Sequence, residues 1–232
     1  MAHLKRLVAP AFWRTPKKGS TWVVTPHPGP HPKFQSIPLS IIIKSFLKLG
    51  DTTTEAQKII RTGEVFVDGK RRKDYAYPAG LFDVVTVPKT NSFYRLISSK
   101  KGLDILETNK ADASLKIFGI KSKTVLKGNK MQLNLHDGKN ITVEKGNYKT
   151  GDSLLLELPS LKVVEHVPFE KGATIMVTKG ADSGKMGKVK STIKGNMREN
   201  EKVVCVIDKE DRIIGKNSLI VIGKEKSAIK VE

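Results

Sequence analysis

A run of four cations, Lys70-Arg71-Arg72-Lys73, directly follows the dipeptide Asp68-Gly69. Four consecutive charges cannot alternate between a buried and an exposed face of a strand, so the whole run must project outward. Asp-Gly is a typical two-residue hairpin turn, and it places these tip cations at the end of a hairpin. Only Asp74 is close enough in sequence to neutralise them. The pattern predicts that all four bind phosphate groups, which position a protein on a polyanion without reading its sequence.

A second candidate site is a loop with Gly180, Gly184 and Gly187, to which Lys185 and Lys188 add charge. Glycines suit a loop that needs positive φ or close backbone approach. A nucleotide-binding phosphate loop is excluded, because that motif has four residues between its glycines and Ser or Thr after the lysine. Here three residues separate the first two glycines, and a methionine follows the first lysine.

Catalytic and metal-binding patterns are not found in the sequence. His27 and His31 are four residues apart, but they lie in a proline-rich segment where they cannot share a helix face. His136 and His166 are isolated, and we expect them at a turn or a strand edge. Cys205, the single cysteine, lies in an apolar run and is expected to be a small buried hydrophobe. We therefore expect no enzyme activity, no metal, no cofactor and no small-molecule substrate.

The charge of the chain points to a nucleic acid. The 232 residues include 42 Lys and Arg against 23 Asp and Glu, for a net charge of +19. Residues 1–100 hold 17 basic and 6 acidic groups, residues 101–170 hold 11 and 9, and residues 171–232 hold 14 and 8. A surplus of this size creates a field that attracts polyanions. We expect the partner mainly on the N-terminal part, with a second contact near the C-terminus.

A membrane partner is not expected. No stretch approaches the roughly 18 apolar residues of a membrane span, and the N-terminus lacks the apolar core of a signal peptide. The sequence thus predicts a cytoplasmic protein.

Residues 1–37 hold six of the eleven prolines and no acidic residue. This proline density disfavours helices and central strands and predicts an extended arm. Trp13 and Trp22 lie among its basic residues and can pack on the protein or stack on bases. We expect the arm to become ordered only on its nucleic acid, because it offers little apolar burial to offset chain entropy.

Residues 38–87 predict two helices followed by a hairpin. Pro38 can open a helix, and an apolar stripe at helical spacing follows from Leu39 to Leu47, with Gly50 placed to end the helix. Thr52 and Glu55 have the spacing of a capping box for a second helix, which Gly63 stops. A strand then enters the hairpin turn, and a closing strand is expected at residues 83–87.

From about residue 93 onward the pattern is β. Short apolar runs are separated by glycine-bearing turns such as Asp137-Gly138 and Gly151-Asp152. Strands this short and regular predict small barrels. The apolar runs are residues 133–135, 141–143, 154–158, 175–177, 203–207 and 219–222.

Two segments resemble known RNA-binding units. Leu47, residues 55–60 (EAQKII) and residues 63–70 (GEVFVDGK) resemble the small RNA-binding domain named after bacterial ribosomal protein S-four. That resemblance implies a basic face presented to structured RNA. Residues 172–189, with their three glycines and flanking β-branched residues, resemble the KOW motif of ribosomal proteins and transcription elongation factors.

Across nearly the whole chain, short stretches occur in the order seen in the ribosomal protein S-four-e family of archaea and eukaryotes. The resemblance, closer to the archaeal form because the C-terminus is short, implies a component of the small ribosomal subunit. It implies small-subunit ribosomal RNA and neighbouring ribosomal proteins as partners, and no cofactor. Besides the KOW unit, the stretches are 3–6 (HLKR), 28–31 (PGPH), 77–80 (YPAG), 83–85 (DVV), 93–97 (FYRLI) and 219–224 (LIVIGK).

The expected fold is α+β and mostly β. We expect a basic extended N-terminal arm over residues 1–37, a small helix–helix–hairpin RNA-binding domain over 38–100, a central β domain over 101–168, and a KOW barrel of SH3-like type with the C-terminal segment over 169–232. The predicted RNA-binding residues are Lys5, Arg6, Arg14, Lys17, Lys18, Lys44, Lys48, Lys58, Arg61, Lys70, Arg71, Arg72, Lys73, Lys185 and Lys188.

Two other classes of protein share parts of this pattern. A pseudouridine synthase can carry the same small RNA-binding domain, but it needs a catalytic aspartate in an Arg-Leu-Asp context, which the sequence lacks. A transcription elongation factor can carry a KOW unit, but that function leaves the basic arm and the helix–hairpin unit unexplained.

Overall fold

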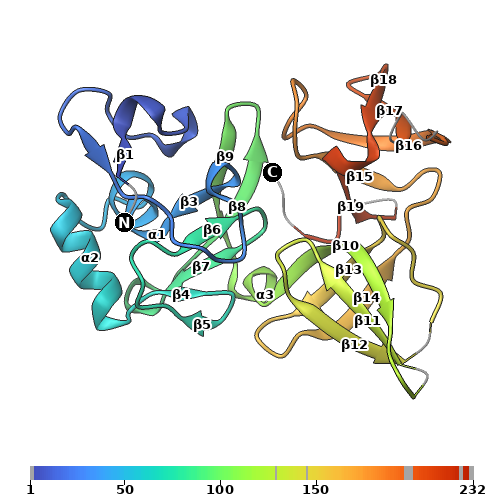
Figure 1. Ribbon diagram of the computed structural model, residues 1–232, viewed down its shortest axis with the longest axis horizontal. Helices are drawn as coiled ribbons and strands as arrows, with labels where there is room; N and C mark the ends of the chain where they lie inside the picture. Colours follow the sequence, from blue (N-terminus) through green and yellow to red (C-terminus); the bar gives the residue numbers. More distant parts are fainter. Residues whose placement is uncertain (1–2, 129, 145, 196–200, 225–226, 230–232) are drawn as a thin grey trace. The chain divides into compact units, whose positions relative to one another are not determined.

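The computed structural model describes residues 3–128, 130–144, 146–195, 201–224 and 227–229 (Figure 1). The ends of the predicted arm and KOW domain, residues 1–2 and 230–232, lie outside the described residues, as do residues 196–200 and 225–226. The chain divides into two compact units, Met1–Ile97 with Lys101–Ser114, and Ser98–Lys100 with Leu115–Glu232. Within the described ranges, no helix has the length and apolar content that crossing a membrane requires.

Strands dominate the first unit, in agreement with the predicted α+β, mostly β class. Its strand orders are β1-β2, β3-β6 and β5-β4-β7-β8-β9. Three short helices accompany them in the described part, with 3-10 turns between. The elements are β1 (Leu4–Lys5), β2 (Trp22–Val23), β3 (Ser36–Pro38), α1 (Leu39–Ile41), α2 (Thr53–Thr62), β4 (Phe66–Val67), β5 (Lys70–Arg71), β6 (Pro78–Gly80), β7 (Val84–Val87), β8 (Ser92–Ser99), β9 (Gly102–Thr108) and α3 (Lys110–Ala113).

The second unit consists of two five-stranded sheets, ordered β12-β11-β10-β13-β14 and β18-β17-β16-β15-β19. The predicted apolar runs all lie within these strands or at their ends. The strands are β10 (Leu115–Val125), β11 (Lys130–Leu135), β12 (Asn140–Glu144), β13 (Ser153–Glu157), β14 (Lys162–Val167), β15 (Thr174–Val177), β16 (Met186–Ile193), β17 (Lys202–Ile207), β18 (Glu210–Gly215) and β19 (Leu219–Gly223).

The first predicted helix forms, but it ends earlier than expected. Pro38 caps α1, and a π-helical turn, Ile42–Phe46, continues it. The predicted stripe is buried at Leu39 and Ile42, as an apolar helix face against a core requires. The prediction that Gly50 ends this helix is wrong, because the left-handed conformation falls on Lys48, at φ +53°.

The second helix, α2, matches its prediction at both ends. Thr52 Oγ1 accepts from the Glu55 amide, while the Glu55 carboxylate accepts from the Thr52 amide, which completes the capping box. Backbone hydrogen bonds from Asp51 and Thr52 lower the pKa of Glu55. Gly63 closes the helix at φ +78°. Two orphan amides at the helix start are thereby satisfied.

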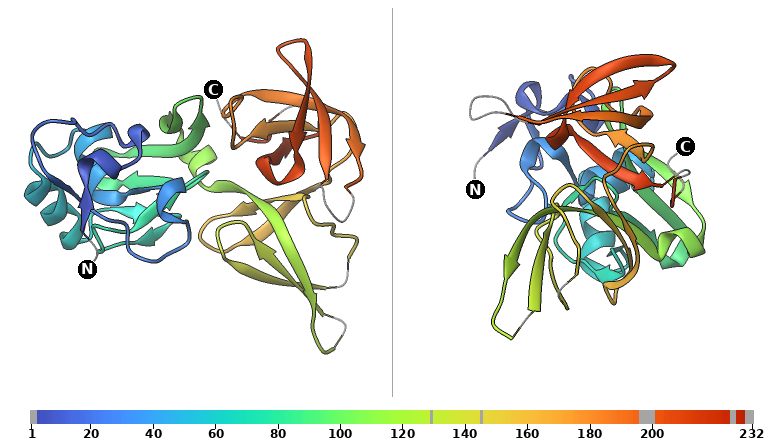
Figure 2. Two further views of the ribbon diagram at one scale, coloured as in Figure 1. Left: turned by 45° about the horizontal axis from the view of Figure 1, so that its top comes forward. Right: turned by 90° about the vertical axis from the view of Figure 1, so that its right-hand side faces the viewer.

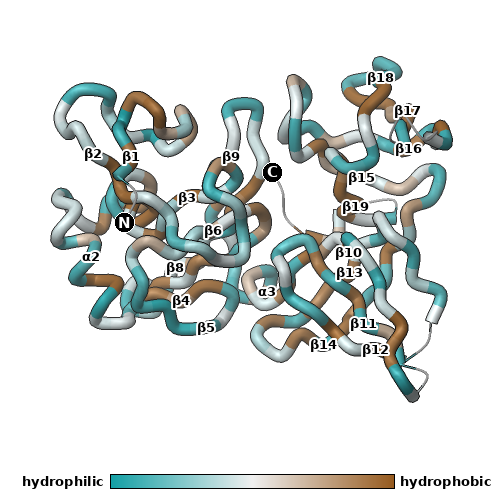
Figure 3. The backbone as a smooth tube through the Cα atoms, viewed as in Figure 1, coloured by the Kyte–Doolittle hydropathy of each residue, from teal (hydrophilic) through white to brown (hydrophobic). Residues whose placement is uncertain are grey.

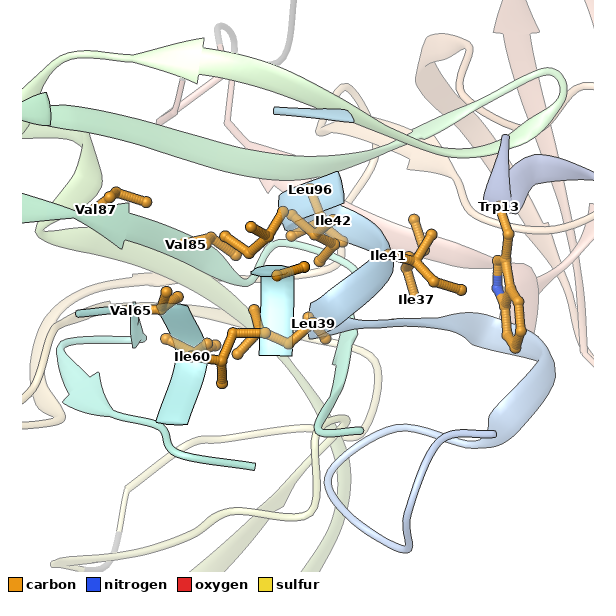
Figure 4. Close-up of a cluster of buried hydrophobic side chains, with 14 of the residues drawn as sticks. Trp13, Ile37, Leu39, Ile41, Ile42, Ile60, Val65, Val85, Val87 and Leu96 are labelled. Carbon is orange, nitrogen blue, oxygen red and sulfur yellow. The ribbon is translucent and has the colours of Figure 1, made fainter. Parts of the chain in front are cut away.

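The N-terminal segment is packed and hydrogen-bonded, which corrects the expectation that it lacks the burial needed for order without RNA. Trp13 is fully buried, and its indole Nε1 donates to the carbonyl of Ser36 at 2.9 Å. Figure 4 shows its ring beside Ile37 and Ile41, which belong to the same buried cluster. The segment is extended, as predicted, with short strands and single 3-10 turns. Trp13, His27 and His31 attach the segment to the rest of the unit.

The second unit contains a buried cluster of apolar side chains between β15, β16, β17 and β19. Cys205 belongs to this cluster and is fully buried, and that burial raises the pKa of its thiol. This outcome confirms the prediction of a small buried hydrophobe. A buried ion pair lies in the other sheet, where Asp137 Oδ2 is 3.7 Å from Lys116 Nζ and 3.0 Å from Lys139 Nζ.

Candidate RNA interface

The tip cations lie where the sequence placed them, on a two-residue hairpin. Asp68 and Gly69 both have positive φ, +51° and +71°, which is the geometry of a type I′ turn between β4 and β5. Lys70 and Lys73 are exposed. They form no ion pair with the described residues, so both ammonium groups are available to phosphate.

The two arginines of the run are engaged within the protein. Arg71 Nε donates to the carbonyl of Gly63 at 2.7 Å, and its Nη2 donates to the carbonyl of Thr62 at 2.6 Å. These carbonyls belong to the end of α2, where unsatisfied acceptors collect. The guanidinium of Arg72 lies 4.5 Å from the ring centre of Tyr77. The run thus combines two free lysines with two arginines that hold the hairpin in place.

The helices add a second set of predicted cations. Lys48 and Lys58 are exposed, and Lys44 Nζ is 3.3 Å from Thr53 Oγ1. The guanidinium of Arg61 lies 5.4 Å from the ring of Tyr75. Exposed cations stacked on an aromatic ring keep their charge and part of their donor set, so they remain compatible with phosphate contacts.

In the N-terminal segment the predicted residues divide again. Lys5, Lys17 and Lys18 are exposed. Arg6 is buried, and its guanidinium donates to the carbonyls of residues 15 and 16, so the structure commits it to holding the loop. Arg14 forms a two-bond ion pair with Asp104 at 2.6 and 2.7 Å. The exposed lysines are therefore the stronger candidates here.

The glycine loop between β15 and β16 has the predicted strand–loop–strand form. Gly180 and Gly184 adopt φ +99° and +87°. Gly187 has ordinary φ but approaches a neighbouring strand so closely that a Cβ would lie 2.6 Å from the Val206 carbonyl oxygen. The loop thus needs positive φ at Gly180 and Gly184, and close backbone approach at Gly187 and also at Gly184, where a Cβ would lie 2.7 Å from the Ser98 carbonyl oxygen.

The loop lysines differ in their surroundings. Lys185 Nζ bonds Asp208 at 2.7 Å and lies 3.5 Å from Asp182, and the hydrogen bond to Asp208 raises the pKa of the lysine. Lys188 is exposed. The acidic pair offsets the charge of Lys185, so Lys188 is the stronger candidate for a phosphate contact.

A further basic surface, the β10–β11 hairpin, was missed by the sequence reasoning. Its signal was visible, since residues 121–130 read KSKTVLKGNK, with four lysines and no acid. Every described residue from 121 to 128, and Lys130, is exposed. The hairpin extends away from the rest of its sheet (Figure 2), and hydrophilic residues lie beside hydrophobic ones near its end (Figure 3), where Val125 and Leu126 are exposed. The lysines are Lys121, Lys123, Lys127 and Lys130.

The outward face of this hairpin sheet is polar as well as basic. Asn134 Nδ2 donates to Ser122 Oγ at 2.8 Å, and Gln132 Nε2 donates to Asn134 Oδ1 at 2.9 Å. The apolar residues of β11 alternate to the other face, where Leu133 is fully buried. A two-faced strand pattern of this kind leaves one side for solvent or a ligand.

The histidines in the proline-rich segment act as links within the first unit. His27 Nδ1 is 2.9 Å from Asp74 Oδ2, and the buried His31 Nε2 is 3.1 Å from Asp83 Oδ2. His136 lies in the turn after β11 and His166 on the edge strand β14, as predicted. In the described part of the chain, no group of three His, Cys, Asp or Glu side chains is arranged to hold a metal.

Small β units that carry exposed lysines at several sites are typical of proteins that bind a polyanion such as a nucleic acid, because the lysines contact its charged phosphate backbone. Comparison with known families specifies which one. Residues 2–34 match the RS4NT (NUC023) domain, residues 38–85 the S4 domain, and residues 90–163 the ribosomal family S4e.

Relatives match over nearly the full length. The chain is 44% identical to small ribosomal subunit protein eS4 of Archaeoglobus fulgidus, over 97% of this chain and 94% of that one. It is 40% identical to the Methanocella arvoryzae protein of the same name, over 98% and 97%. The crystal structure of the 30S ribosomal protein S4e from Thermoplasma acidophilum superposes with a TM-score of 0.73 at 28% identity, covering 85% of this chain and 99% of that one. The chain belongs to ribosomal family S4e.

Proposed function

We propose that the chain is a structural constituent of the small ribosomal subunit that binds ribosomal RNA and supports subunit assembly and translation. The observation that carries the proposal is the set of exposed lysines on the hairpin tip, the helices and the N-terminal segment, within a family whose relatives are small-subunit proteins. In this role the protein is a non-enzymatic part of the ribosome and works in the cytoplasm.

The way in which it binds follows from the chemistry of those side chains. Lysine ammonium groups on long, flexible stems suit phosphate oxygens, and contacts of this kind fix position without base specificity. Each phosphate contact releases condensed counterions, so affinity falls steeply with salt. The hairpin of β10 and β11 would add a contact to RNA from the second unit. The surfaces that do not face RNA would contact neighbouring ribosomal proteins.

Sedimentation tests this function. A tagged copy, expressed in cells that carry the protein, is expected to co-sediment with small subunits on a sucrose gradient, and to remain with them when the two subunits are separated. Release only by high salt would agree with binding through phosphate. Recovery at the top of the gradient, or with RNA polymerase, would contradict the proposal, and recovery on immature particles alone would favour an RNA-modifying role.

A further inference from the structure

The two-stranded ribbon of β1 and β2 carries an exposed tryptophan, Trp22. In the antiparallel register Leu4 lies opposite Val23, and Lys5 lies opposite Trp22. Leu4 is buried and Val23 packs on the core of the unit, so the other pair occupies the outward face. The side chain of Trp22 is 52% exposed. Trp22 and Lys5 are therefore cross-strand neighbours on the outward face of the ribbon.

The position of this ring is held by the structure around it. The amide of Arg6 donates to the carbonyl of Thr21 at 3.0 Å, which extends the pairing of the ribbon. The hydroxyl of Ser20 donates to the carbonyl of Trp22 at 3.1 Å. The ring of His3 lies 5.1 Å from the indole at a 50° tilt. The backbone that carries the indole is thus fixed before any partner arrives, which reduces the entropy lost on binding.

Folding alone does not explain an exposed tryptophan at this place. Trp13, in the same segment, is fully buried and hydrogen-bonded, as tryptophans usually are. Leu7 and Val8, which follow the first strand, are also exposed, at 83% and 62%. Each of these exposed apolar side chains is removed from water when a partner covers it, and that removal favours binding.

The surrounding charge identifies the partner. The first acidic residue of the chain is Asp51, and the loop between the two strands carries exposed Lys17 and Lys18. A partner for such a surface must combine negative charge with a flat π face. An unpaired nucleotide has both, and stacking of bases on aromatic side chains is a recurring mode of RNA recognition.

We propose that Trp22 and Lys5 form a binding site for an unpaired nucleotide of RNA, with the base stacked on the indole and a phosphate at the ammonium group. The inference rests on the proposed function and adds a base contact to binding that otherwise depends on phosphate. A site of this kind distinguishes single-stranded from duplex RNA, since both faces of a base inside a duplex are covered by the neighbouring base pairs.

The emission of Trp22 provides a local measurement. The chain has two tryptophans, so the difference between wild type and Trp22→Phe isolates the signal of Trp22 in the full-length protein. Titration with a short single-stranded RNA of mixed sequence is expected to quench that signal in a saturable way. A duplex of equal length is expected to leave it nearly unchanged. Other basic surfaces also bind RNA, and this signal does not report on them.

Matched variants test the two parts of the site. Lys5→Gln is expected to weaken the quenching and to lower its log–log salt slope by about 0.7, the value for one phosphate contact to a single strand. Phe34→Ala is the control, because Phe34 is 64% exposed in the same segment but lies in the 3-10 turn Lys33–Gln35, outside the β1–β2 ribbon. This control is expected to bind like wild type.

Three outcomes would overturn the site. The first is equal quenching by duplex and single-stranded RNA. The second is a loss of quenching in Phe34→Ala equal to that in Lys5→Gln. The third is a change of emission that depends on protein concentration without RNA, which would indicate that a second copy of the chain covers Trp22. If these occur while the chain still co-sediments with small subunits, the nucleotide site fails and the proposed function stands. Loss of co-sedimentation by the wild type would instead contradict the proposed function.

Discussion

At the residue scale, neighbouring cations of one basic run have different surroundings. Lys70 and Lys73 are exposed, whereas Arg71 donates two hydrogen bonds to the end of α2. Arginine suits that position because its planar fork presents several donors in a fixed arrangement. A basic run in a sequence therefore combines exposed cations that are available to a ligand with cations whose hydrogen bonds hold the surface in place.

Separate substitutions should resolve the two tasks. Lys70→Gln with Lys73→Gln is expected to weaken RNA binding and to flatten the salt dependence by roughly 0.7 to 0.9 in log–log slope per lost contact, with unfolding unchanged. Arg71→Ala is expected to reduce the free energy of unfolding by about 1 to 2 kcal/mol, because the acceptors of α2 lose a charged donor. RNA titrations at several salt concentrations and urea unfolding measure both. Parallel salt plots for the lysine variant would show that the tip does not touch phosphate.

The buried carboxylate of Asp137 makes a pH-dependent contribution. Burial raises its pKa, but the ammonium groups of Lys116 and Lys139 outweigh burial, so the pKa lies below its ordinary value. A carboxyl with a lowered folded pKa stabilises the protein above its unfolded pKa, and that stabilisation is lost as the pH falls through the folded value. The effect therefore belongs to the range below about pH 4.

Asp137→Asn tests this contribution. The side-chain oxygen of the asparagine can still accept from the Lys139 backbone amide, now 3.1 Å from Asp137 Oδ1, while an uncharged NH2 group replaces Oδ2 beside the two ammonium groups. We expect a loss of about 3 kcal/mol at neutral pH, because the buried Lys116 loses its carboxylate, and a weaker fall in stability on acidification. Adding Lys116→Met should restore much of the loss. Urea unfolding at neutral and acidic pH measures it, and identical pH profiles for wild type and variant would contradict the argument.

At the element scale, two glycines of the loop between β15 and β16 are required for different reasons. Gly180 has positive φ with open space around it. At Gly184, a Cβ would lie 2.7 Å from the Ser98 carbonyl oxygen and from Ser99 Cα, residues that cluster with the same unit. A side chain at position 180 would meet backbone strain only, whereas a side chain at position 184 would meet both backbone strain and a steric clash.

This difference provides a matched pair of variants. Gly180→Ala is expected to reduce the free energy of unfolding by about 1 kcal/mol through left-handed strain. Gly184→Ala is expected to cost about 3 kcal/mol, because overpacking against backbone adds to that strain. Urea unfolding of the full chain compares them. Equal losses would mean that the loop yields around residue 184 and has no required shape.

At the scale of the whole molecule, the N-terminal segment belongs to the first unit. Trp13, His27 and His31 contact residues that lie 23 to 52 positions further along the chain. Proline-rich segments have few hydrogen bonds of their own, so such distant partners determine whether they are ordered. The basic loop between β1 and β2 is therefore attached to a segment that the rest of the unit holds in place.

Removing Trp13 should expose this dependence. Trp13→Ala is expected to lower the free energy of unfolding by about 3 to 5 kcal/mol, the usual cost of deleting a buried aromatic. Amide exchange on the free wild-type protein should show protection at Arg6, His27 and Leu39, whose amides donate to carbonyls of the unit. The variant should lose that protection first at Arg6. Free exchange of all three in wild type would show that the segment is ordered only on RNA.

The sequence by itself determined the features that depend on neighbours within a few residues. The capping box of Thr52 and Glu55, the Asp68-Gly69 turn and the strand runs all formed as predicted, because each rests on local hydrogen bonds or on side-chain alternation. The resemblance of short, ordered stretches also indicated the family that the comparisons show.

Tertiary structure alone decided which members of each pattern are free. Burial separates Trp13 from Trp22, and distant carbonyls and carboxylates engage Arg6 and Lys185 but leave Lys188 exposed. These outcomes depend on groups brought together only when the chain folds. A sequence records the type of each side chain, whereas its burial and its charge partners follow from contacts that no local pattern contains.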